Sequence, residues 1–152
     1  MNGTLTVEGS LTDLADAAGV LAAHFAQLKV RVSALTVGGY SVEGAKAVLH
    51  KLASPQRTVI ELLVANGGHV SVHDVRVALG RQSADTLRGL TGPISKHVNR
   101  LIAQGVLPAG TLPPTVTKYD NTAGTQRAQR FWMESELVPV FEAALSAIAP
   151  HP

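Results

Sequence analysis

TGPISKHVNRLIAQGVL, residues 91–107, combines an apolar face and a basic face at helical spacing. With a helical period of about 3.6 residues, one apolar stripe of the helix contains Ile94, Val98, Leu101 and Ile102. Thr91 is placed to cap the first turn, and Pro93 fits inside that turn because its missing N–H is not needed there. Gly105 can adopt the left-handed conformation that ends a helix. The stretch therefore predicts an amphipathic helix.

The opposite face of this predicted helix is polar and basic. It carries Gly92, Lys96, Asn99, Arg100 and Ala103, with Ser95 and His97 on its flanks. Many helices keep a solvated basic face that binds nothing, so charge alone does not assign a function. The choice between a solvated surface and a recognition helix depends on the rest of the chain.

Length and composition are those of a single globular unit. The 152 residues are enough for one well-packed domain, or for one domain with a helical attachment. The absence of cysteine excludes disulfides, thiolate metal ligands and a cysteine nucleophile, and it is typical of a reducing compartment. The N-terminus lacks the pattern of a signal peptide, and no apolar run approaches the roughly 20 residues that cross a bilayer. We therefore expect a cytoplasmic protein with no membrane partner.

The charge of the chain is unevenly distributed, although its net value is only +2. Residues 1–50 hold three basic and four acidic residues, and residues 51–130 hold ten basic against four acidic residues. Residues 131–152 hold no basic residue and three acidic ones. Excess positive charge around the predicted amphipathic helix is expected of a surface that binds phosphates.

The N-terminal region, residues 1–40, is predicted to contain a short strand at residues 4–7 and then a long helix from Ser10 to about Leu35. Apolar residues recur in this helix with alternating spacings of three and four, a pattern that can join two copies of the chain or pack the helix on its own domain. We expect a homodimer. The predicted dimerisation residues are Leu11, Leu14, Leu21, Phe25, Leu28 and Val32.

Residues 41–134 contain the elements expected on either side of the amphipathic helix. Ser41 is placed to cap a helix over 42–52, and a second helix is predicted over 55–65. A short strand is expected over 69–72, and Ser71 can cap a two-turn helix that ends at Gly80. After the proline-rich connector 107–115, two extended stretches within 116–133 predict a β-hairpin.

The last region, residues 135–152, is predicted to be a helix that packs on the domain or on a dimer interface. Ser135 is its expected N-cap, and Pro139 lies in its first turn.

This order of elements resembles the winged helix-turn-helix superfamily of bacterial transcription regulators, which includes the MarR and ArsR families. The resemblance covers Ser54 to Met133 and is strongest at SKHVNRLIAQGVL, which ends in Arg100-Leu101, Gly105 and Leu107. It implies a mainly α fold with a small β-hairpin wing, preceded here by the long N-terminal helix. The sequence departs from the pattern in the turn between the two central helices, which residues 81–90 enlarge.

The resemblance implies sequence-specific binding to double-stranded DNA. The helix over 91–104 would enter the major groove, where Asn99 would pair with adenine and Lys96 or Arg100 with guanine or phosphate. Ser95 would contact a base or a phosphate. The wing, with Lys118, Arg127 and Arg130, would follow the backbone or reach the minor groove. A homodimer would then bind a two-fold operator, and repression would follow from blocked promoter access.

The same sequence also allows other functions. A winged helix can also serve as a protein-interaction module or as a non-specific architectural DNA-binding protein, and a small-molecule effector of unknown identity can occupy a cleft beside the N-terminal helix. His69 and His73, with Asp74, have a spacing seen in metal sites, but no third ligand accompanies them, and we predict no metal. No nucleotide loop or nucleophile motif is present, so we expect neither a cofactor nor an enzyme. Phe131 and Trp132 are predicted to be core residues.

Overall fold

The computed structural model describes residue 20 and residues 36–82, 87, 89–120 and 127–149. Except for Val20, all of these residues belong to one compact unit, Thr36–Pro152. The predicted N-terminal strand lies outside the described residues, and so does the dimerisation pattern from Leu11 to Val32. The fold that follows is therefore that of the second unit.

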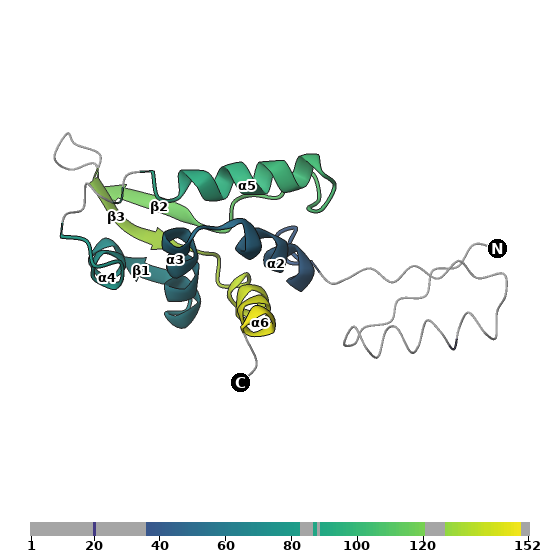
Figure 1. Cartoon of the computed structure of the whole chain (residues 1–152), viewed down its shortest axis with the longest axis horizontal. Coiled ribbons are helices and arrows are strands. Elements are labelled where there is room, and N and C mark those ends of the chain that lie inside the picture. The colour runs from purple at the N-terminus through teal and green to yellow at the C-terminus, as the bar shows by residue number, and fades with distance from the viewer. Residues whose placement is uncertain (1–19, 21–35, 83–86, 88, 121–126, 150–152) are drawn as a thin grey trace. The chain divides into compact units, whose positions relative to one another are not determined.

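Five helices and three strands make up the described part of this unit (Figure 1). In chain order they are α2 (Val42–Lys51), α3 (Ser54–Ala65), β1 (His69–Ser71), α4 (Val72–Ala78), α5 (Gly92–Ala103), β2 (Val116–Asp120), β3 (Arg127–Trp132) and α6 (Val138–Ile148). The mainly helical character and the paired strands of the predicted hairpin are confirmed. The arrangement is compatible with a winged-helix-like fold.

Two of the four predicted N-caps are present. The Ser41 hydroxyl accepts a hydrogen bond from the Gly44 backbone N–H at 3.0 Å, which satisfies one free donor in the first turn of α2. At α4 the Ser71 hydroxyl accepts from the Asp74 backbone N–H at 3.0 Å and donates to the Asp74 carboxylate at 2.6 Å. The residue Val72, predicted to extend β1, is the first residue of α4 instead.

The other two predicted caps are wrong. Thr91 precedes α5, but its backbone is already helical (φ −90°, ψ −19°), and its side chain caps nothing. The Thr91 hydroxyl lies 3.2 Å from the hydroxyl of Thr117 on β2, so it links α5 to the sheet. Ser135 lies too far upstream because α6 begins at Val138, whose N–H bonds to the Ser135 carbonyl at 3.3 Å.

The three strands form an antiparallel sheet in the order β1-β3-β2, with β3 in the centre. Phe131 of β3 pairs with Val70 on one side and with Thr117 on the other, and Phe131 is 2% exposed. Arg130, its neighbour, pairs with Lys118. Because successive side chains point to opposite faces of a strand, Arg130 and Lys118 lie on the face away from Phe131 and Thr117.

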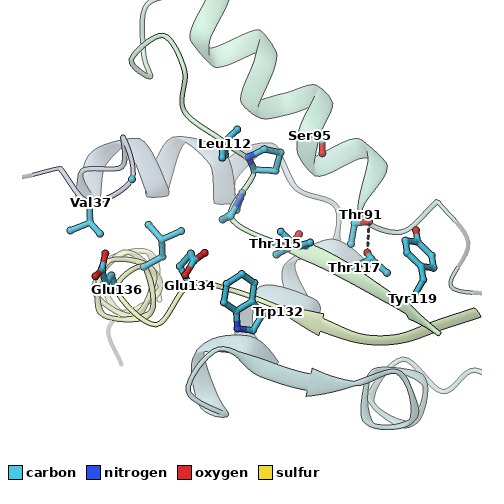
Figure 2. A pocket seen from close by; sticks show the side chains of 15 residues that line it. Val37, Thr91, Ser95, Leu112, Thr115, Thr117, Tyr119, Trp132, Glu134 and Glu136 are labelled. Carbon is cyan, nitrogen blue, oxygen red and sulfur yellow. Dashed lines mark hydrogen bonds between the residues drawn. The ribbon is translucent and has the colours of Figure 1, made fainter. Parts of the chain in front are cut away.

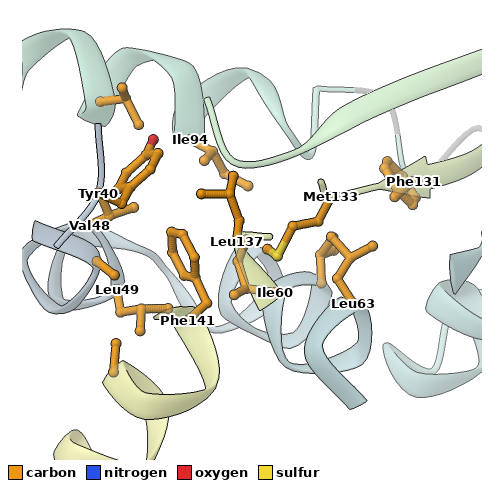
Figure 3. Packing of buried hydrophobic residues seen from close by; sticks show 14 of the residues in the cluster. Tyr40, Val48, Leu49, Ile60, Leu63, Ile94, Phe131, Met133, Leu137 and Phe141 are labelled. Atoms are coloured by element: carbon orange, nitrogen blue, oxygen red, sulfur yellow. The ribbon is translucent and has the colours of Figure 1, made fainter. Parts of the chain in front are cut away.

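The core lies between the helices and the inner face of the sheet (Figure 3). Helix α6 packs against α2 and α3, so the C-terminal helix belongs to this core. The largest fully buried residue is Tyr40, whose ring meets Phe141 edge to face at a centroid distance of 5.2 Å. Residues 36–40 are thus part of the core and more than a break between helices.

The turn from α3 into β1 depends on Gly68. Its φ of +100° is a conformation that L side chains rarely adopt, and an added Cβ would lie 2.6 Å from the Met133 carbonyl oxygen. The Gly68 carbonyl in turn accepts a hydrogen bond from the Met133 N–H at 2.8 Å. This close approach fixes the end of β3 against α3.

Within the described residues, no helix has both the length and the apolar character needed to cross a bilayer.

Candidate nucleic-acid interface

Helix α5 separates its buried and exposed residues as the sequence predicts. Ile94 and Val98 are fully buried and Leu101 is 4% exposed, which fixes one face of the helix in the core. Lys96, Asn99 and Arg100 are all exposed on the opposite side. We call these three residues the basic face of α5. Residues three and four apart on a helix are neighbours, so the three side chains form one surface.

The basic face has no partner elsewhere in the described part of the protein. None of its three side chains takes part in a hydrogen bond or an ion pair there, whereas exposed Arg57 and Glu61 on α3 pair at 3.2 Å. Three hydrogen-bonding side chains, two of them cationic, are therefore available to an external ligand. Ser95 and His97, on the flanks, are half-buried.

The enlarged turn before α5 is anchored to the core. Leu87 and Leu90, at its end, are each 5% exposed, and the Leu90 N–H bonds to the Leu87 carbonyl at 3.2 Å. Residues 83–86 and 88 of this turn lie outside the described range. The two buried leucines nevertheless fix where α5 begins.

The basic residues of the hairpin lie on a different surface. Lys118 and Arg130 are exposed and face each other across β2 and β3. They occupy the sheet face opposite Thr117, and Thr117 is the residue that contacts the start of α5. The predicted DNA contacts thus form two separate sets. Arg127 is the first residue of β3, and its side chain lies outside the described part.

Trp132 is not the core residue that the sequence analysis predicts. It is half-buried on the outer face of the sheet, where the Lys118 ammonium lies 5.2 Å from its ring centroid. Phe131, by contrast, is buried as predicted. Phe131 and Trp132 lie in different environments because adjacent side chains on a strand point to opposite faces of the sheet.

A groove of about 510 Å³ runs beside α5 (Figure 2). Its walls are residues 37–38, the start of α5, the proline-rich connector with β2, and the segment that leads into α6. The residues that line it are Val37, Gly38, Thr91, Ser95, Leu112, Pro113, Pro114, Thr115, Val116, Thr117, Tyr119, Trp132, Glu134, Glu136 and Leu137. This groove has no signal in the sequence, where the prolines of residues 107–115 indicate only a connector.

Tyr40 holds the connector in place. Its hydroxyl donates a hydrogen bond to the Leu112 carbonyl at 2.7 Å, although 72 residues separate the two along the chain. Burial raises the pKa of the Tyr40 phenol well above its ordinary value of 10.0, so the donor stays protonated. The wall of the groove is thereby tied to the core.

The histidines considered as metal ligands have other neighbours. The His73 Nδ1 atom lies 3.2 Å from an Arg76 guanidinium nitrogen, and the His69 ring lies 6.2 Å from the Trp132 ring. No group of three or more potential metal ligands occurs among the residues that the structure describes.

No family model, curated protein or solved structure matches this chain.

Proposed function

We propose that this protein is a transcriptional regulator that binds double-stranded DNA, and that α5 is its recognition helix. The observation that carries the proposal is the basic face of α5. A helix fixed in the core on one side presents two cations and an amide on the other, without partners among the described residues. A major groove about 12 Å wide accepts a helix, and its base edges bind these side-chain types.

Each of the three residues would make a different contact with DNA, according to the chemistry of its side chain. Asn99 can donate to and accept from adenine, and Arg100 can donate two parallel hydrogen bonds to guanine. Lys96 is a compact charge near the start of the helix and is best suited to a phosphate. Ser95 would add a short phosphate or base contact at the edge of this surface.

The hairpin would provide a second phosphate contact. Lys118 and Arg130 are like charges directly opposite each other on two strands, an arrangement that destabilises a hairpin by itself. An anion between them would relieve that repulsion. Because they lie on another sheet face than Thr117, we assign them a smaller share of the affinity than the basic face. The contact predicted for Arg127 stays a prediction.

The proposed assembly is a homodimer that acts as a repressor. The spacing of Leu11, Leu14, Leu21, Phe25, Leu28 and Val32 supports dimerisation. Two copies of α5 would then read two half-sites about one helical turn apart, so the operator would be palindromic.

Selection from random-sequence DNA by the full chain, at about 50 mM and about 200 mM salt, tests this function. We expect enrichment of a palindromic site and an affinity that falls steeply with salt. The double variant Asn99→Ala/Arg100→Ala should lose the enrichment but keep weak binding at low salt. Enrichment that survives in the double variant would contradict α5 as the recognition helix. No binding at low salt would contradict DNA binding altogether.

A further inference from the structure

The groove beside α5 gathers much of the exposed apolar surface of the described residues. Leu112, Val116 and Tyr119 are 75%, 48% and 52% exposed, and all three line it. Large exposed apolar side chains that cluster around one groove mark a site that binds a ligand or a partner. A volume of about 510 Å³ lies within the range of roughly 300–1,000 Å³ that is typical of small-molecule sites.

The polar groups of the groove select the charge of a ligand. Glu134 and Glu136 both line it, and their carboxylates have no hydrogen bond or ion pair within the described part of the chain. No lysine, arginine or histidine is among the lining residues. The groove therefore favours a cation and repels an anion, even though the whole chain carries a net charge of +2.

A buried hydroxyl provides an independent sign of a missing partner. Thr115 is 7% exposed, and its Oγ1 is buried without a hydrogen-bond partner among the described residues. Such a group costs free energy unless something satisfies it. Thr115 lines the same groove, between Leu112 and Val116 on the connector.

The aromatic residues of the groove also suit a cation. Trp132 and Tyr119 line it, and the Trp132 ring already attracts the Lys118 ammonium at 5.2 Å. Because Lys118 already occupies the Trp132 ring, the exposed Tyr119 ring is the one that stabilises an organic cation in the same way. Figure 2 shows Glu134 near Trp132, on the segment that leads into α6.

We propose that this groove binds a lipophilic organic cation, an ammonium group on a compact apolar body. The apolar body contacts Leu112, Val116 and the prolines, and the carboxylates of Glu134 and Glu136 neutralise the charge. The Thr115 hydroxyl oxygen accepts a hydrogen bond from the ammonium. Thr91 and Ser95 belong both to the groove and to the start of α5. Resting on the proposed function, the inference adds that the bound cation changes the affinity for DNA.

The test uses the fluorescence of Trp132, the only tryptophan of the chain, which lines the groove. The full chain is titrated with adamantane-1-methylammonium and, separately, with the neutral adamantane-1-methanol and the anionic adamantane-1-carboxylate. These three ligands share one apolar body and do not absorb where tryptophan does. A ligand of about twelve non-hydrogen atoms is expected to bind with Kd on the order of 1 mM.

We expect saturable binding of the ammonium at least about tenfold tighter than that of the carboxylate, equivalent to about 1.4 kcal/mol. Glu134→Gln/Glu136→Gln should reduce this ratio to about threefold or less. Glu61→Gln/Glu142→Gln, which removes the same two charges from exposed positions outside the groove, is the matched control and should retain the ratio. Equal binding of the three ligands, or no saturable change, would overturn the proposal.

Two further measurements separate this inference from the function on which it rests. Thr115→Val, which keeps the shape but removes the hydroxyl, should fold and weaken ammonium binding several-fold. DNA affinity is then measured with and without the ammonium. If the chain binds the cation but not DNA, the cation site is supported and the proposed function as a DNA-binding regulator is overturned. DNA binding unaffected by a saturating cation would overturn the coupling alone.

Discussion

The basic face of α5 and the groove beside it are neighbours of opposite character. The basic face is exposed and presents Lys96, Asn99 and Arg100 without an apolar anchor. The groove is walled by prolines and exposed apolar residues, and its only charged lining residues are Glu134 and Glu136. Local charge, rather than the net charge of +2, therefore determines which kind of ligand each of these adjacent surfaces would bind.

The two regions are joined at the start of α5. Ser95 follows the buried Ile94 and lines the groove, and the basic face begins with the next residue, Lys96. Any displacement of this first turn moves both surfaces. Removing their common support should therefore affect both surfaces, whereas changing one surface should leave the other intact.

Ile94→Ala should produce the largest effect, because it removes the support common to both surfaces. Ile94 is fully buried, and truncation of such a residue lowers the free energy of unfolding by about 2–5 kcal/mol. Urea unfolding measures the loss. Ile94→Val should cost only about 0.5–1.5 kcal/mol and retain both ligands. Equal costs for the two variants would show that Ile94 does not pack as described.

Arg100→Ala should weaken specific DNA binding by about 1–3 kcal/mol and relax the preference at one base pair. The free energy of unfolding should change little because the side chain is exposed and without a described partner. Arg100→Lys keeps the charge but loses the paired donors, so it should retain the salt dependence and lose the base preference. An unchanged base preference in both variants would restrict Arg100 to phosphate contact.

Tyr40→Phe should lower the free energy of unfolding by about 0.5–1.5 kcal/mol, since it removes the hydrogen bond to the Leu112 carbonyl. It should loosen the groove wall while DNA affinity is retained. Trp132 fluorescence measures ammonium binding of this variant, and a parallel DNA-binding measurement distinguishes the two surfaces. A parallel loss of both activities would show that the wall of the groove also sets the position of α5.

The pH dependence of this variant has a defined sign. In the wild type the folded Tyr40 keeps its proton because its pKa is raised, whereas the unfolded chain loses that proton above its ordinary pKa of 10.0. The contribution is therefore complete below about pH 10 and is lost as the pH rises, by up to about 1.4 kcal/mol per pH unit. Tyr40→Phe should unfold with a correspondingly weaker dependence above pH 10. Identical alkaline profiles would contradict the burial of the phenol.

Arg130→Ala should have the smallest effect. It relieves the repulsion from Lys118 across the strands, so the free energy of unfolding should stay unchanged or rise by up to about 0.5 kcal/mol. DNA binding should weaken slightly and equally for all sequences. Arg130→Gln, which keeps more of the side-chain length, is the control for lost packing. A larger loss of affinity than that of Arg100→Ala would place the main DNA surface on the hairpin.

Much of the fold could be predicted from local sequence signals. The stripe containing Ile94, Val98 and Leu101 predicts both the helix and its buried face, and Ser41 and Ser71 cap the helices that they precede. These features depend on residues a few positions apart, where helical geometry fixes the neighbours. The polar side of α5 could be identified for the same reason.

The remaining features depend on contacts between distant residues. Thr91 has the sequence signal of a cap, but its partner is Thr117 on β2, and Tyr40 is buried because Phe141 and Leu112 meet it from far along the chain. The groove arises from four separate segments and has no local signature. Trp132 looks apolar in sequence, yet its register on β3 directs it outward.

Two lysine substitutions test directly whether DNA binds to α5. Lys96→Ala on the basic face and Lys51→Ala on α2 remove the same charge from exposed helical positions. DNA affinity is measured as a function of salt concentration for both variants and the wild type. Lys96→Ala should reduce the salt slope by about one and weaken binding, while Lys51→Ala should leave both unchanged. Equal effects of the two substitutions would show that DNA affinity depends only on the net charge of the protein, and would contradict recognition by α5.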